Sequence, residues 1–116
     1  MSGQELTTCV VDARQAVIDA YNQWRISSQE AAKAEAAYQA AKAARYVELK
    51  AETRSATDAA NRVKGDVQVN NYLMDRDCKA ALADADKELI QIRKLDLRCL
   101  EAQYEREWSL AGKDMM

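Results

Sequence analysis

Apolar and aromatic residues recur at steps of three and four along the first half of this chain. This spacing places them on one face of an α-helix, which turns once every 3.6 residues. Because neither Pro nor Gly occurs between residues 4 and 53, we expect one helix over about residues 3–53, roughly 75 Å long. Ser2 and Glu5 fit a capping box at its start. The face predicted to be buried comprises Leu6, Val10, Ala13, Val17, Tyr21, Trp24, Ser28, Ala31, Glu35, Tyr38, Ala41, Arg45 and Leu49.

Capping residues predict a turn region after this helix. Ser55 and Asp58 fit a second capping box, in which each side chain satisfies an unpaired backbone N–H, so a short helix should cover about residues 55–63. Gly65 is expected to end that helix in the left-handed conformation, which Gly adopts without steric cost. Asp66 can then cap the next helix.

A second long helix is predicted over about residues 66–111. The spacing of three and four resumes at Val67, and Gly112 is expected to end the helix because Gly commonly follows a helix terminus. The face predicted to be buried comprises Val67, Leu73, Ala81, Leu82, Ala85, Leu89, Ile92, Cys99, Ala102 and Trp108.

The two long helices are expected to fold back on each other, because a short connection makes consecutive helices antiparallel neighbours. The predicted fold class is therefore all-α: one elongated antiparallel helical hairpin, with a short helix at the turn, forming a single domain over residues 1–116. A fold-back symmetric about residue 59 places residues side by side when their numbers sum to about 118. This register pairs Tyr46 with Tyr72, Tyr38 with Ala80 and Ala81, Tyr21 and Trp24 with Lys94 and Leu97, and Val10 with Trp108.

The apolar surface of both helices exceeds what one partner helix can cover. Seven apolar residues of the second helix spread over roughly 220°, whereas one neighbouring helix requires a stripe of roughly 100°. Val11 and Ile18 likewise form a second stripe on the first helix. Because a two-helix hairpin has no interior of its own, we expect a homodimer, as a four-helix bundle or a coiled-coil-like dimer. The seven residues of this apolar arc are Leu89, Ile90, Ile92, Leu95, Leu97, Cys99 and Leu100.

Composition and charge favour a helical protein and argue against nucleic-acid-binding, secreted and membrane-spanning classes. Ala accounts for 22 of 116 residues and Pro is absent, which favours long helices. With 17 basic and 19 acidic side chains interleaved, a broad phosphate-binding field is not expected. The start of the chain lacks the basic and apolar segments of a secretion signal, and no stretch approaches the roughly 20 apolar residues of a membrane span. We therefore expect a cytoplasmic protein without a membrane partner.

Motifs for catalysis and metal binding are nearly absent. His, the usual general base and the commonest metal ligand, does not occur. Carboxylates spaced by four residues could hold Mg²⁺ if two such pairs faced each other, but we expect them to be solvated and paired with nearby Lys and Arg. We predict no catalytic residue, no cofactor and no metal site. The carboxylate pairs are Glu48 with Glu52, Asp84 with Glu88, and Glu101 with Glu105.

Two further features concern thiols and a charged pair. Cys78 and Cys99 lie about 30 Å apart along one predicted helix, too far to bridge within a chain. We expect these two and Cys9 to be reduced thiols that are buried or half-buried. Arg93 and Asp96 lie within the apolar arc, where they form either a surface pair of little energetic value or a buried pair that fixes the register.

The strongest candidate for a binding surface is the end of the hairpin opposite the turn. Aromatic and Arg residues lie there among apolar ones, a composition that protein interfaces favour. Aromatic rings beside guanidinium groups also stack on unpaired bases, so single-stranded nucleic acid is an alternative ligand, disfavoured because Glu105 and Glu107 flank Arg106. The residues predicted to contact a partner are Tyr21, Trp24, Arg25, Leu95, Leu97, Tyr104 and Trp108.

Three segments alternate aromatic, Ala and charged residues: Tyr38–Tyr46, Val67–Leu73 and Ala81–Leu89. In this pattern, over about residues 20–110, the chain resembles small uncharacterised helical-hairpin proteins of bacteriophages, often encoded among recombination and replication genes. The resemblance implies a phage-type accessory, adaptor or inhibitor in the host cytoplasm, and it transfers no functional residue. We therefore expect a non-enzymatic protein–protein interaction module. The alternative is an accessory protein of recombination or replication that binds single strands.

Overall fold

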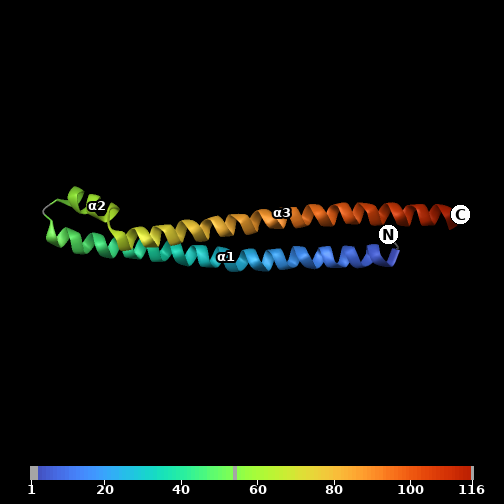
Figure 1. The fold of residues 1–116 in the computed structure, drawn as a ribbon, viewed down its shortest axis with the longest axis horizontal. Helices are drawn as coiled ribbons and strands as arrows, with labels where there is room; N and C mark the ends of the chain where they lie inside the picture. Colours follow the sequence, from blue (N-terminus) through green and yellow to red (C-terminus); the bar gives the residue numbers. More distant parts are fainter. Residues whose placement is uncertain (1–2, 54, 116) are drawn as a thin grey trace. The chain divides into compact units, whose positions relative to one another are not determined.

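The computed structural model describes residues 3–53 and 55–115, which form three helices (Figure 1). They are α1 (Gly3–Glu52), α2 (Ala56–Lys64) and α3 (Val67–Met115). No strand occurs within the described residues, so the all-α prediction is confirmed. The predicted helix ends agree closely except at the end of α3, which continues through Gly112 because an exposed Gly costs a helix only about 1 kcal/mol. The predicted capping box at Ser2 begins outside the described residues.

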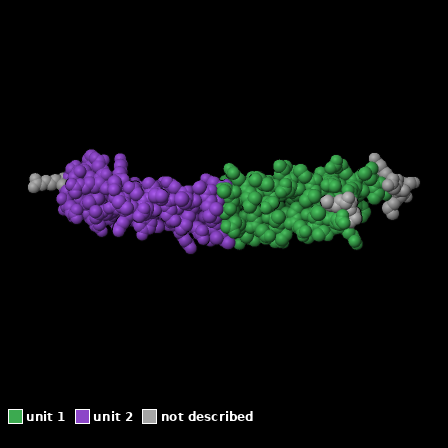
Figure 2. Space-filling model, in the orientation of Figure 1, with its two compact units in different colours: residues 1–25, 85–116 green, residues 26–84 purple. Residues whose placement is uncertain are grey.

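The chain divides into two compact units, which Figure 2 colours separately. Unit 1 comprises residues 1–25 and 85–116, and unit 2 comprises residues 26–84. Both long helices therefore contribute one segment to each unit, while α2 and the connections on either side of it belong to unit 2. The single domain over residues 1–116 stays a prediction.

Burial along α1 follows a seven-residue repeat instead of the predicted 3.6-residue period. Tyr21 and Glu35, predicted to be buried, are exposed, whereas Ala20 and Ala34 beside them are buried. A mean period of 3.5 residues is typical of a helix that keeps one face against one partner helix, as in a coiled coil. The buried and half-buried positions include Leu6, Val10, Ala13, Val17, Ala20 and Trp24 in unit 1, and Ser27, Ala31, Ala34, Tyr38, Ala41 and Arg45 in unit 2.

The buried face of α3 differs from the predicted one. Val69 and Ala83 in unit 2 and Ile90 in unit 1 are buried, at multiples of seven residues. The same face carries long polar side chains such as Arg76 and Lys94, which are half-buried and cover apolar surface with their aliphatic stems. The prediction from hydropathy therefore took the more apolar side of α3 as the buried face, whereas that side faces solvent. The wrongly predicted positions, all exposed, are Val67, Ala81, Leu82, Ala85, Ile92, Cys99, Ala102 and Trp108, whereas Leu73 and Leu89 are half-buried.

In unit 1, the α1 and α3 segments lie side by side and run in opposite directions (Figure 1). The Lys94 ammonium lies 5.1 Å from the centroid of the Tyr21 ring. Arg14 Nε lies 3.9 Å from Glu101 Oε1. Both pairs of residue numbers sum to 115, so the register is shifted by about three residues from the predicted one.

In unit 2, one ion pair joins α1 to α3, and a second joins α1 to Asp66, the residue just before α3. Arg76 Nε lies 3.3 Å from Glu35 Oε2, and Arg45 Nε lies 2.8 Å from Asp66 Oδ2. Both pairs of residue numbers sum to 111, so the predicted register is wrong here by about seven residues. The fold-back is not symmetric about residue 59, because α2 packs as a third helix against the end of α1.

The core of unit 2 forms where its three helices meet. Leu49 of α1, Ala59 and Val63 of α2 and Val69 of α3 are buried together. Tyr38 and Tyr46, spaced by eight residues on α1, pack against this cluster. The small Ala59 has no exposed surface, which brings α2 close to its neighbours.

The connections around α2 are capped as the sequence predicts, with one difference. The Ser55 hydroxyl accepts a hydrogen bond from the Asp58 N–H at 3.4 Å, which confirms the Ser55 half of the predicted capping box, and the Asp58 carboxylate lies 3.5 Å from Arg62 Nε. Gly65 adopts φ −94° and ψ 0°, so the predicted left-handed conformation is wrong. The Gly65 and Asp66 N–H groups donate to the carbonyls of Arg62 and Val63, three residues earlier, and this tight right-handed turn leads directly into α3.

Candidate interaction surfaces

All seven residues predicted to contact a partner belong to unit 1. Tyr21, Trp24 and Arg25 lie on α1, and Leu95, Leu97, Tyr104 and Trp108 lie on α3. Among the apolar and aromatic members, Trp108 is 63% exposed and Leu95 is 57% exposed. Leu97 and Tyr104 are separated by about 10 Å along α3, and of the seven residues only Tyr104 and Trp108 line a hollow at the end of unit 1, so the seven fall into two groups.

The group near Leu97 includes two aromatic residues that differ in exposure. The Tyr21 ring is exposed, with the Lys94 ammonium over its face, whereas Trp24 is half-buried between the helices. Arg25 Nη2 donates a hydrogen bond to Asn22 Oδ1 at 3.1 Å, which holds the guanidinium along its own helix. Binding of single-stranded nucleic acid through Trp24 and Arg25 stays a prediction.

The second group lines a hollow at the end of unit 1. The Tyr104 and Trp108 rings meet edge to face, with centroids 6.1 Å apart and planes inclined by 63°. The hydroxyls of Thr7 and Thr8 donate to backbone carbonyls one turn earlier in α1. This unit 1 hollow, of about 840 Å³, is lined by Gly3, Gln4, Leu6, Thr7, Thr8, Tyr104, Glu107, Trp108 and Ala111.

The apolar arc of α3 is covered only in part. Ile90 is buried and the three leucines at 89, 97 and 100 are half-buried, whereas Ile92, Leu95 and Cys99 are exposed. On α1, Val11 and Ile18 are exposed over half of their surface or more. One partner helix therefore leaves apolar side chains of both unit 1 segments in solvent, as the width of the arc predicts.

The Arg93–Asp96 pair and two of the three thiols are more exposed than a buried pair and buried or half-buried thiols would be. Arg93 Nη1 lies 3.8 Å from Asp96 Oδ2, and both side chains are about half exposed, so this is a surface pair. Cys9 is half-buried as predicted, but Cys78 and Cys99 are exposed, because the face of α3 that carries them points to solvent. All three are free thiols.

Unit 2 contains a hollow of about 640 Å³ among its three helices, which the sequence did not indicate. Its walls come from segments that meet only on folding, so no local motif marks it. The one local signal is Tyr38, Lys42 and Tyr46, spaced by four residues on one face of α1. This unit 2 hollow is lined by Tyr38, Gln39, Lys42, Ala43, Tyr46, Val47, Ala60, Val63, Lys64, Val69, Asn70 and Leu73.

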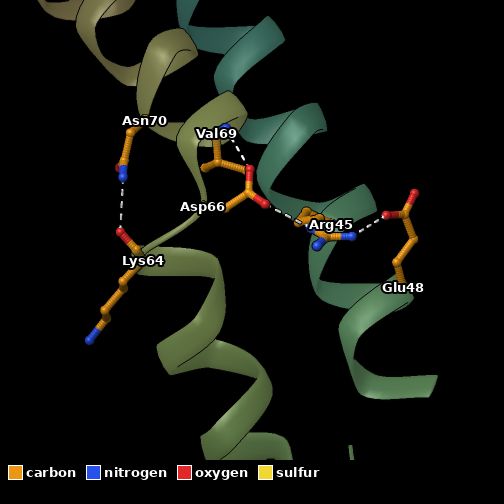
Figure 3. A network of polar contacts seen from close by, with 6 residues as sticks. All are labelled: Arg45, Glu48, Lys64, Asp66, Val69 and Asn70. Carbon is orange, nitrogen blue, oxygen red and sulfur yellow. Dashed lines mark hydrogen bonds and ion pairs between the residues drawn. The ribbon is translucent and has the colours of Figure 1, made fainter. Parts of the chain in front are cut away.

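A separate polar network of unit 2 joins α1 to the start of α3 (Figure 3). Asp66 Oδ1 accepts from the Val69 N–H at 3.0 Å and Oδ2 accepts from Arg45 Nε at 2.8 Å. The Val69 N–H, and then the Arg45 guanidinium, lower the pKa of the Asp66 carboxyl. Arg45 also donates to Glu48 at 2.9 Å, and both carboxylates raise the pKa of its guanidinium. These charges are paired and serve to join the helices.

Residues 3–53 and 55–115 form neither a metal-binding cluster nor a membrane-spanning helix. Within that part of the chain, no three Cys, Asp or Glu side chains gather closely enough to hold a metal ion. No helix there combines the length and the apolar content needed to cross a bilayer.

No protein-family model, curated protein or solved structure matches this sequence.

Proposed function

We propose that this chain is a non-enzymatic protein–protein interaction module, a helical hairpin that pairs with a second copy of itself. The observation that carries the proposal is the exposed apolar surface of unit 1. Ile92, Leu95, Val11 and Ile18 each expose more than half of their surface. Burying a fully exposed side chain of this kind contributes about 1.5–3 kcal/mol, so covering the exposed half of each gives about 1 kcal/mol per residue, and several together favour association.

The distribution of these side chains supports a second copy as the first partner. Ile92, Leu95 and Cys99 lie on the side of α3 away from α1, at the three-and-four spacing that helix pairing uses. A two-fold dimer brings the same patch of both copies together, so a chain that exposes one apolar helix face already carries both halves of such an interface. Two hairpins joined in this way form a four-helix bundle.

A second surface is proposed for another protein. Tyr104 and Trp108, with the unit 1 hollow beside them, combine exposed aromatic area with an apolar floor at Leu6. Aromatic anchors beside pockets dominate the binding energy of many protein interfaces. With the pattern-level resemblance to phage hairpin proteins, this supports the role of an accessory, adaptor or inhibitor of a host or viral protein.

Self-association is tested by sedimentation of the wild type and of two double variants. We expect a dimer at micromolar concentration for the wild type and a monomer for Ile92→Lys/Leu95→Lys. Val47→Lys/Met74→Lys provides the matched control, because both residues are as exposed but belong to unit 2, and it should remain a dimer. Circular dichroism should report equal helix content in all three proteins.

A monomeric wild type that also fails to bind a dye for exposed apolar surface contradicts the self-association proposal. For the second surface, a protein captured by the wild type should be lost with Trp108→Ala and retained with Val47→Ala. Equal capture by the two variants would place the contact outside the unit 1 hollow.

A further inference from the structure

The unit 2 hollow combines an apolar floor with a rim of one charge. Val63 and Val69 belong to the buried cluster, and the Tyr38 and Tyr46 rings pack against that cluster from α1. Leu73 of α3 completes the apolar wall. A volume of about 640 Å³ lies within the range of small-molecule sites, which run from about 300 to 1,000 Å³ and are mostly apolar with a few polar groups.

The charged residues that line this hollow are Lys42 and Lys64, and no Asp or Glu lines it. Within residues 3–53 and 55–115, neither ammonium group forms an ion pair with a carboxylate. In Figure 3 the Lys64 ammonium points away from the Arg45–Asp66 pair. Glu48 and Asp66 pair with Arg45, so they do not neutralise the two lysines. The rim of the hollow is therefore positively charged and attracts an anionic group.

The walls of the hollow are held by contacts within the protein itself. Asn70 Nδ2 donates to the Lys64 carbonyl at 3.1 Å, which ties the end of α2 to the first turn of α3. The Lys42 ammonium lies 5.9 Å from the Tyr38 ring centroid, and Gln39 donates its amide to Glu35 at 2.9 Å. The hollow is therefore formed before any ligand arrives, which reduces the conformational cost of binding.

We propose that the unit 2 hollow binds a small anionic amphiphile, a carboxylate on an unbranched hydrocarbon chain. The apolar chain lies along Tyr46, Val63 and Leu73, and the carboxylate lies at the rim beside Lys42 and Lys64. From Tyr38 to Val47 the lining of α1 extends about 14 Å, the length of a chain of about a dozen carbons. This site lies in unit 2 and goes beyond the protein-binding function proposed for unit 1.

The charge requirement is tested with two probes of equal chain length, dodecanoate and dodecyltrimethylammonium, each below its micelle concentration. Two-dimensional ¹⁵N–¹H NMR spectra of the full chain follow the titration. Dodecanoate should shift the resonances of Ala43, Val47, Ala60 and Leu73 in a saturable way, and the cationic probe should bind at least tenfold more weakly. Equal affinity for both probes, or the absence of saturable shifts, overturns the proposal.

Variants then locate the site. Lys42→Gln/Lys64→Gln should weaken dodecanoate binding at least tenfold, whereas the matched control Lys33→Gln/Lys87→Gln removes two exposed charges elsewhere and should leave it unchanged. Ala43→Phe, at an exposed lining position, should block the hollow without lowering the melting temperature. Equal weakening by both lysine pairs overturns the proposal, since the effect is then that of net charge alone.

Dodecanoate binding at the unit 2 hollow is expected to be independent of self-association through unit 1. The Ile92→Lys/Leu95→Lys variant of unit 1 should bind dodecanoate as the wild type does, so failure of the dimer leaves this site standing and the reverse also holds. Phosphatidylglycerol vesicles give the last arm: protein that binds vesicles but not free dodecanoate would overturn the assignment of a small amphiphile.

Discussion

At the scale of single residues, Asp66 shows how one side chain can both cap a helix and join two helices. Its side chain accepts from the Val69 N–H, and it also pairs with Arg45 from α1. The cap is visible in the sequence because it acts over three residues. The partnership with Arg45 is not, because 21 residues separate the two in the chain.

Acid should weaken the fold through Asp66. Its pKa is lowered in the folded protein, so its stabilising contribution is present above the unfolded value of about 3.9 and is lost as the pH falls through the folded value. Asp66→Asn keeps a capping oxygen but removes the charge, and Asp66→Ala removes both. At pH 7 we expect melting temperatures in the order wild type, Asn, Ala.

The pH dependence separates the two effects of Asp66. Between pH 5 and pH 2 the melting temperature of the wild type should fall more steeply than that of Asp66→Asn. Parallel curves for the two proteins would mean that the carboxylate charge contributes nothing.

Asp86 is a second residue with a clear energetic consequence. Its Oδ2 is buried and has no hydrogen-bond partner among the residues that the structure describes. A buried acceptor left unsatisfied costs about 1–3 kcal/mol, so Asp86→Ala should raise the free energy of unfolding by an amount of this order. Urea titration measures the change, and Asp84→Ala, at an exposed position, should stay within about 0.5 kcal/mol of the wild type. Destabilisation by Asp86→Ala contradicts the prediction.

At the scale of elements, residues close in the sequence determine where each helix begins and ends, whereas contact with other helices determines which face is buried. Capping residues and helix propensity place the ends of α1 and α2 within one residue of those expected. The buried face of α1 drifts from the expected one because contact with α3 imposes a seven-residue repeat. Small residues such as Ala34 and Ala83 occupy that repeat in unit 2 and let the helices approach closely.

Packing at Ala34 tests this repeat. Ala34→Leu adds three carbon atoms to a buried position and should lower the free energy of unfolding by about 1–3 kcal/mol through overpacking. Ala36→Leu makes the same change at an exposed position and should have little effect. If thermal unfolding shows the opposite order, the buried face of α1 is not the one described.

At the scale of the whole molecule, the net charge is −2, but paired and unpaired charges lie in different places. In unit 2, the Arg45 guanidinium pairs with both Glu48 and Asp66, whereas Lys42 and Lys64 at the hollow do not pair with carboxylates among the described residues. Unit 1 instead exposes apolar side chains on both of its helix segments. The two proposals follow from this difference: unit 1 for proteins, and unit 2 for an anionic amphiphile.

The apolar surface of unit 1 could be predicted from the sequence, whereas the unit 2 hollow could not. The excess of apolar residues between 89 and 100 is a property of one helix, so it could be recognised without a partner helix. Leu95 and Trp108 are exposed, and the exposure of Trp108 differs from its predicted place on the buried face of the second helix. The unit 2 hollow could not be recognised, because Tyr46, Val63 and Leu73 come from three separate helices.

The sequence by itself determined the helical class, most helix ends, the cap at Asp66 and the surplus of apolar surface. Each of these depends on propensities and hydrogen bonds that act within about four residues. Tertiary structure alone decided which face of α3 is buried, the register within each unit, the ion pair between Arg45 and Asp66, and the hollow with its two lysines. These depend on packing between segments distant in the chain, where aliphatic stems of Lys and Arg cover apolar surface as well as leucines do.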